Sequence, residues 1–192
     1  MKDLHLRYFN ECFQIVPTNL YVGLLLLFCL GTVFLMTFLG CKRGLKWSLR
    51  ILLLENLFLL IYLTVISRSV MAERIHYLTP FRSYRAIMAG SSLTLIQNLM
   101  NVLVFVPIGA LLGCSFDNMK WWKVALFAAI FSFLIETLQF VTKRGFAEFD
   151  DVFHNVIGCL TGYGLYIVLS FLIRSISTSK LVVHKKESSQ QY

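Results

Sequence analysis

Several polar and charged side chains in this sequence lie within or directly beside long apolar stretches. Carboxyl groups in such surroundings can act as general acids or bases, and Glu136 and Asp151 are the candidates for that role. Amide and guanidinium groups beside them can orient a bound ligand through hydrogen bonds. The candidate ligand-binding residues are Asn101, Glu136, Gln139, Arg144, Asp150, Asp151 and Asn155.

The spacing of these residues is that of helix faces. Glu136 and Gln139 are three residues apart, with Ser132 one turn earlier, and Asp151 and Asn155 are four residues apart. Side chains three or four positions apart lie on the same side of a helix. We therefore expect one polar face on each of the two helices that carry these pairs.

The carboxylates do not form a recognisable metal or cofactor motif. His154 beside Asp150 and Asp151 has the chemistry of a ligand for a divalent cation. However, the sequence contains no H-E-x-x-H and no acidic motif with the spacing of a dedicated site. P-loop, dinucleotide-binding and G-x-S-x-G motifs are also missing. We expect neither a metal nor a cofactor.

The elements that position these residues are membrane helices. The chain has 192 residues, of which 57% are hydrophobic and only 15% are charged. Soluble domains carry about 25% charge, and a helix crosses the bilayer with about 20 apolar residues. Five apolar runs fit that length, and they cover residues 20–39, 49–66, 93–112, 124–141 and 152–173. The sequence predicts an all-α, multi-pass helical bundle with about five transmembrane helices.

Antiparallel packing of consecutive helices brings the polar residues to one end of the bundle. Asn101 lies early in the third run, Glu136 lies late in the fourth, and Asp151 lies just before the fifth. Lys42 and Arg43 directly follow the first run, which favours an outside N-terminus and an inside C-terminus. With that orientation the polar residues lie at the outer leaflet.

The order of these motifs resembles the VanZ-like family of bacterial membrane proteins. The resemblance runs over residues 78–169, and one position, Glu148, departs from it because the family often has Asp there. It rests on the motifs Leu78-Thr79-Pro80-Phe81, Asn101-x-x-x-Phe105-x-Pro107-x-Gly109, Glu136-x-x-Gln139-Phe140 and Arg144-x-Phe146-x-x-x-Asp150-Asp151-x-x-x-Asn155-x-x-Gly158.

The resemblance implies a role in the bacterial cell envelope. The family takes its name from a protein of glycopeptide-resistance gene clusters that gives low-level teicoplanin resistance. We therefore expect an outer-leaflet polar pocket that recognises a membrane lipid, a lipid-linked cell-wall intermediate or a glycopeptide. The alternative is a membrane enzyme that acts on a lipid-linked phosphate or glycan at the same leaflet.

Three segments follow from this interpretation. Residues 1–66 hold two transmembrane helices, residues 67–174 form the VanZ-like core with three, and residues 175–192 are a basic cytoplasmic tail that we expect to be poorly ordered. The net charge of +8 comes from basic residues that flank the apolar runs, so we expect no nucleic-acid partner. Gly158-x-x-x-Gly162 allows close helix packing either within one chain or between chains, which leaves the oligomeric state open.

Overall fold

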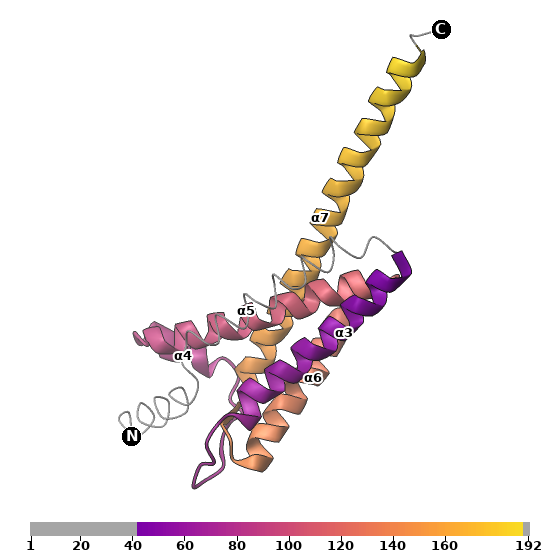
Figure 1. Cartoon of the computed structure of the whole chain (residues 1–192). Helices are drawn as coiled ribbons and strands as arrows, with labels where there is room; N and C mark the ends of the chain where they lie inside the picture. The colour runs from indigo at the N-terminus through magenta and orange to yellow at the C-terminus, as the bar shows by residue number, and fades with distance from the viewer. Residues whose placement is uncertain (1–41, 190–192) are drawn as a thin grey trace.

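The computed structural model describes residues 42–189, which fold mainly as helices (Figure 1). Helix α3 (Lys42–Ile61) continues into a π-helical turn, η1 (Tyr62–Ile66). Three further long helices follow, namely α5 (Ser92–Ser115), α6 (Trp121–Thr142) and α7 (Phe149–Ser189). The first apolar run, residues 20–39, lies outside the described residues.

Four helices in the described part of the chain are long and apolar enough to cross a membrane. These spans are Lys46–Ile66, Ser92–Ser115, Trp121–Thr142 and Phe149–Ile173. Each one contains the apolar run expected there apart from small shifts at the ends. The prediction of an all-α, multi-pass membrane protein is confirmed.

Helices α5 and α7 pack backbone against backbone. A methyl group placed on Gly158 would lie 2.1 Å from the carbonyl oxygen of Val102, and one on Gly162 would lie 1.8 Å from that of Val106. Only a hydrogen atom fits at these distances, which is how small residues bring membrane helices together. The Gly158-x-x-x-Gly162 pattern therefore packs within the chain.

The apolar core lies where α3, α5, α6 and α7 meet. Phe105 and Ile108 of α5 are fully buried, as are Val124 and Ala128 of α6 and Cys159 of α7. Many large apolar side chains on the outer faces of the same helices are exposed, as expected for surfaces that face lipid. The helices thus form a bundle that is apolar inside and outside and polar at one end.

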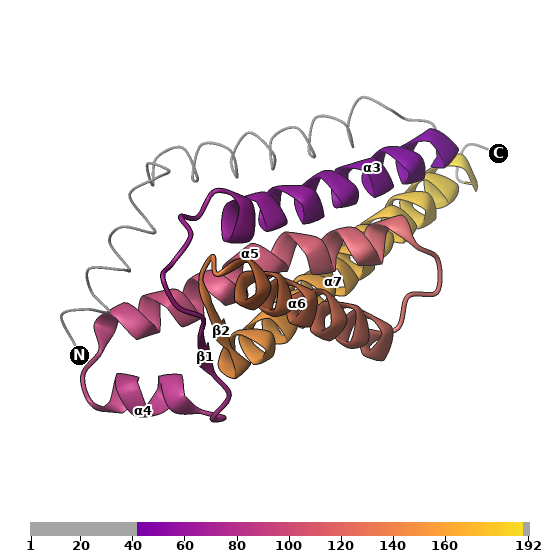
Figure 2. The ribbon, with the colours of Figure 1, turned by 90° about the horizontal axis from the view of Figure 1, so that it is seen from below.

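Two short strands and a short helix lie at that polar end (Figure 2). Strand β1 (Ile75–Tyr77) pairs in parallel with β2 (Phe146–Glu148), and Tyr77 is in register with Glu148. Helix α4 (Arg82–Met88) follows β1 and leads to α5. The sequence indicated only a connector and a turn here, because strands of three residues are too short to show a period of two.

The C-terminal segment differs from our expectation of a poorly ordered tail. Helix α7 continues without a break to Ser189 and extends away from the bundle (Figure 1). No glycine or proline follows Gly164 in this stretch, so the sequence contains no residue that would stop the helix.

Candidate functional site

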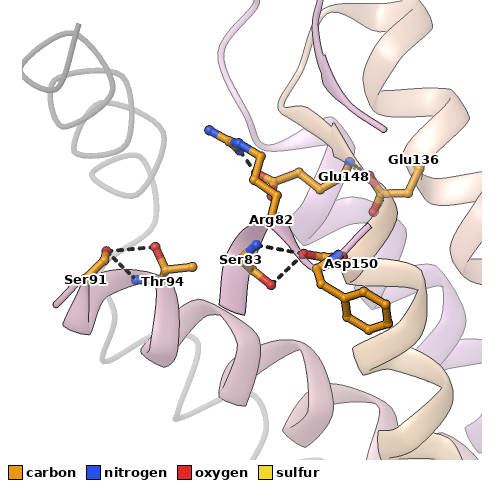
Figure 3. A network of polar contacts seen from close by, with 8 residues as sticks. Arg82, Ser83, Ser91, Thr94, Glu136, Glu148 and Asp150 are labelled. Atoms are coloured by element: carbon orange, nitrogen blue, oxygen red, sulfur yellow. Dashed lines mark hydrogen bonds and ion pairs between the residues drawn. The ribbon is translucent and has the colours of Figure 1, made fainter. Parts of the chain in front are cut away.

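Three carboxylates from different elements meet at the polar end of the bundle. Glu136 comes from α6, Glu148 ends β2, and Asp151 lies in the first turn of α7. Glu136 Oε2 accepts a hydrogen bond of 2.8 Å from the backbone N–H of Glu148 (Figure 3). The charge of Asp151 acts on both other carboxylates. We call Glu136, Glu148 and Asp151 the carboxylate cluster.

Polar groups from two further segments surround the carboxylate cluster. The side chain of Asn101 on α5 hydrogen-bonds to Asp151. The guanidinium of Arg68, which follows η1, is close enough to act on all three carboxylates. A methyl group on Gly145 would lie 2.7 Å from Nη1 of Arg68, so this glycine leaves room for the guanidinium. Because the three carboxylates share the guanidinium of Arg68, the cluster is rich in hydrogen-bond acceptors.

Glu148 is the member of the cluster that lies just outside the membrane spans. Burial raises the pKa of Glu148 to about 7, and the negative charge of Asp151 adds to the shift while Arg82 opposes it. Arg82 Nη1 lies 3.9 Å from Glu148 Oε2, and 26% of the Glu148 side chain is exposed. Glu148 can therefore gain or lose a proton near neutral pH.

Asp150 has a structural task at the start of α4. Its Oδ1 accepts a hydrogen bond from the backbone N–H of Phe81 at 2.6 Å, and its Oδ2 accepts from the backbone N–H and hydroxyl of Ser83 at 2.8 and 2.7 Å (Figure 3). Carboxylates stabilise helix N-termini in this way. Because both oxygens already have donors within the chain, we do not include Asp150 among the residues proposed to bind a ligand.

His154 lies beside α4 rather than in the carboxylate cluster. Its Nε2 is 3.0 Å from the hydroxyl of Tyr84, and the two rings stack with centroids 5.5 Å apart. Among the described residues, no group of three or more His, Cys, Asp or Glu side chains has an arrangement that would hold a metal ion.

The remaining predicted site residues bridge neighbouring helices and loops. Asn155 Nδ2 on α7 donates to Ser132 Oγ on α6 at 2.7 Å. Gln139 Nε2 donates to the carbonyl of Thr64 at 3.1 Å. Arg144 Nη1 donates to the carbonyls of Ile66 and Arg68, so it holds the segment after η1 in place.

Within residues 42–189, two buried amide oxygens at this end lack a hydrogen-bond partner, as do Nδ2 of Asn98 and Nδ1 of His154. The two oxygens are Oδ1 of Asn155 and Oε1 of Gln139, and both side chains are buried. Thr64 offers only a carbonyl oxygen to Gln139, which fixes the amide orientation and leaves Oε1 as the free acceptor. Unpartnered buried acceptors are unusual in folded proteins and can accept hydrogen bonds from a ligand.

Sequence reasoning missed Arg68 and Glu148 as site residues. Arg68 looked like an ordinary basic residue at the end of an apolar run, and nothing in its neighbourhood signalled a contact with α7. Glu148 did carry a signal, because it occupies a position within the family motif three residues before Asp151. Glu148 is the last residue of β2, and its backbone N–H donates to Glu136 on α6.

Comparison with known proteins gives the family of this chain. The VanZ/LLP1 family matches residues 53–171, which begins within α3 and so extends further toward the N-terminus than the resemblance seen in the motifs. Protein VanZ of Enterococcus faecium is 32% identical over 66 residues, which is 34% of this chain and 41% of that protein. The alignment thus spans less than half the length of this relative, and no solved structure matches. With its family match over most of the described core, the chain belongs to the VanZ/LLP1 family.

Proposed function

We propose that this protein recognises an amphipathic molecule of the bacterial cell envelope at the carboxylate cluster, and that this gives low-level teicoplanin resistance. The observation that carries the proposal is the meeting of Glu136 and Asp151 from two different membrane spans. A charged group at the centre of a span costs about 2.5–3.5 kcal/mol on insertion scales, which is an upper bound for Glu136 and Asp151 because they lie toward the polar ends of their spans. Within the chain, Arg68, Asn101 and the N–H of Glu148 act on these two carboxylates, and a ligand with hydrogen-bond donors would add to them.

The chemistry around the cluster favours a donor-bearing headgroup. The three carboxylates share the guanidinium of Arg68, and the buried Oε1 of Gln139 has no donor within the described residues. Hydroxyl and amino groups of a sugar or peptide headgroup supply donors of this kind. A lipid-linked cell-wall intermediate and an acylated glycopeptide both combine such a headgroup with an apolar tail that fits the surrounding lipid.

We propose that this recognition takes place at the outer leaflet. Basic residues lie at both ends of the bundle, and the proposed orientation rests on Lys42, Arg43 and Lys46, which directly follow the first apolar run. The outer leaflet is where teicoplanin and exported cell-wall intermediates meet the membrane. The membrane in question is that of a bacterial cell, as in the VanZ relative.

Expression in a teicoplanin-sensitive bacterial host tests this proposal. We expect the wild-type chain to raise the inhibitory concentration of teicoplanin and Glu136→Gln and Asp151→Asn to abolish the increase at equal protein levels. The matched control is Glu73→Gln, which neutralises an exposed carboxyl in the connector before β1. Unchanged resistance in both site variants would refute the proposed role of the cluster.

A catalytic role is the second candidate, and Glu148 is the observation that favours it. A carboxyl with a pKa of about 7 beside a second carboxyl suits proton transfer at neutral pH. The exposed Arg82 and Arg85 lie at the same end and offer donors to a phosphate. Turnover of a labelled undecaprenyl-phosphate lipid by the purified protein, lost in Glu136→Gln, would establish this activity, and equal turnover in the variant would exclude Glu136 from it.

A further inference from the structure

Helix α4 and the residue that precedes it expose apolar side chains beside the start of α7. Ser83 is buried, whereas Phe81, Tyr84 and Met88 are exposed, Met88 by 81%. Tyr84 and Met88 are four residues apart on one face of the helix, and Phe81, which precedes the helix, packs its ring edge-to-face on that of Tyr84 with centroids 5.9 Å apart. An apolar outward face is unfavourable in water and typical of a helix that lies in a membrane interface.

This apolar face is continuous with the lipid-facing surface of a membrane span. The ring of Phe81 packs edge-to-face on that of Phe153, with centroids 6.2 Å apart. Phe153 belongs to the span of α7 and is itself 44% exposed. The exposed surface of α4 therefore adjoins the exposed surface of the α7 span near its first turn.

The charges on α4 match the polar boundary of a bilayer. Arg82 and Arg85 are both exposed and carry long apolar stems. Arginine side chains on interfacial helices lay the stem along acyl chains and hold the guanidinium at the lipid phosphates. Leu78, 68% exposed in the turn before α4, adds a further apolar group on the approach to the helix.

The height of α4 relative to the spans is fixed by Asp150. Its carboxylate binds the backbone of Phe81 and Ser83 from the first turn of α7. The start of α4 therefore moves with the end of the α7 span and cannot slide along the bilayer normal on its own.

We propose that the turn at residues 78–81 and α4 form an interfacial ledge whose partner is the lipid surface. Leu78, Phe81 and Met88 enter the upper acyl-chain region, and Arg82 and Arg85 bind lipid phosphates. Since Arg82 also approaches Glu148, the ledge sets the carboxylate cluster at headgroup level. This inference concerns bulk lipid and does not depend on the function proposed above.

Depth-dependent fluorescence quenching in nanodiscs tests the ledge with the full chain. A small fluorescent amino acid is incorporated at Met88, at Leu78 or, as a control, at the exposed Glu73. The nanodiscs contain phosphatidylcholine and phosphatidylglycerol, with or without a lipid that carries a nitroxide at carbon 5 of one acyl chain. Iodide serves as the quencher from the water phase. Two ledge positions guard against a local effect of one label.

The expected result is a ratio of lipid quenching to iodide quenching about threefold higher at positions 78 and 88 than at position 73, because interfacial helices bury about 5–10 Å into the boundary. Ratios at both ledge positions equal to that at position 73 would overturn the proposal. If Glu136→Gln loses teicoplanin resistance but keeps the quenching ratios of the wild-type chain, the ledge is independent of the proposed function.

Discussion

The capping of α4 by Asp150 leads to the most sharply defined prediction. The carboxylate is buried and accepts three hydrogen bonds, from two backbone N–H groups and one hydroxyl. A hydrogen bond to a charged group contributes about 1.5–3 kcal/mol. The three share one carboxylate, and the bond to the N–H of Phe81 is only partly buried. We therefore expect Asp150→Ala to cost about 3–4 kcal/mol, less than the sum.

The expected order of variants follows from how many acceptors remain. Asp150→Asn keeps one oxygen acceptor and should lose about half as much stability as Asp150→Ala. For a chain of this length 1 kcal/mol moves the unfolding midpoint by about 2–4 °C, so Asp150→Ala should melt about 10 °C lower in detergent. Asp117→Asn is the control, because that carboxyl is 75% exposed at the other end of the bundle, and its midpoint should stay unchanged.

Trypsin gives a second readout that is local to α4. Release of the helix start should expose the backbone at Arg82 and Arg85, so Asp150→Ala should be cleaved there faster than the wild-type chain at a temperature where both are folded. The capping of α4 by Asp150 would be refuted if Asp150→Ala had the same melting midpoint as the Asp117→Asn control and was cleaved by trypsin at the wild-type rate.

Two further predictions concern packing and pH. Gly162→Ala places a methyl group 1.8 Å from the carbonyl oxygen of Val106 and should lower the free energy of unfolding by about 1–3 kcal/mol. In the control, Gly164→Ala, the methyl group meets nothing within 4 Å, so this variant should be neutral or slightly stabilising. Equal melting midpoints of the two variants in detergent would contradict the packing of α5 on α7. The raised pKa of Glu148 stabilises the fold below the pKa of the unfolded chain, and this contribution, at most about 3 kcal/mol, is lost as the pH rises through about 7. Melting midpoints between pH 5 and 8 should therefore fall less steeply in Glu148→Gln than in the wild-type chain or in Glu73→Gln, and parallel slopes would show that Glu148 does not titrate in this range.

The sequence was sufficient to predict the membrane helices and their polar end. Apolar runs of about 20 residues can only satisfy their backbone in lipid as helices, and consecutive spans alternate in direction. Those two facts bring Asn101, Glu136 and Asp151 to one end without further information. The Gly158-x-x-x-Gly162 pattern was equally readable as close packing, although only the structure shows that the packing occurs within the chain.

The smaller elements at that end could not be predicted in the same way. Strands β1 and β2 are three residues each, and their pairing joins segments about 70 residues apart. Asp150 and Asp151 are adjacent and chemically alike, so nothing in their types separates a helix cap from a member of the carboxylate cluster. The difference arises from the direction in which α7 begins, which is a property of the assembled fold.

Native mass spectrometry of the purified protein tests the central claim most directly. The probes are teicoplanin and an undecaprenyl-pyrophosphate-linked cell-wall intermediate, each added to the wild-type chain, to the Glu136→Gln/Asp151→Asn double variant and to Glu73→Gln. Our account predicts adducts with at least one probe for the wild-type chain and Glu73→Gln, and their loss in the double variant while it still melts like a folded protein. Equal adducts in all three proteins, or none in any of them, would contradict recognition at the carboxylate cluster.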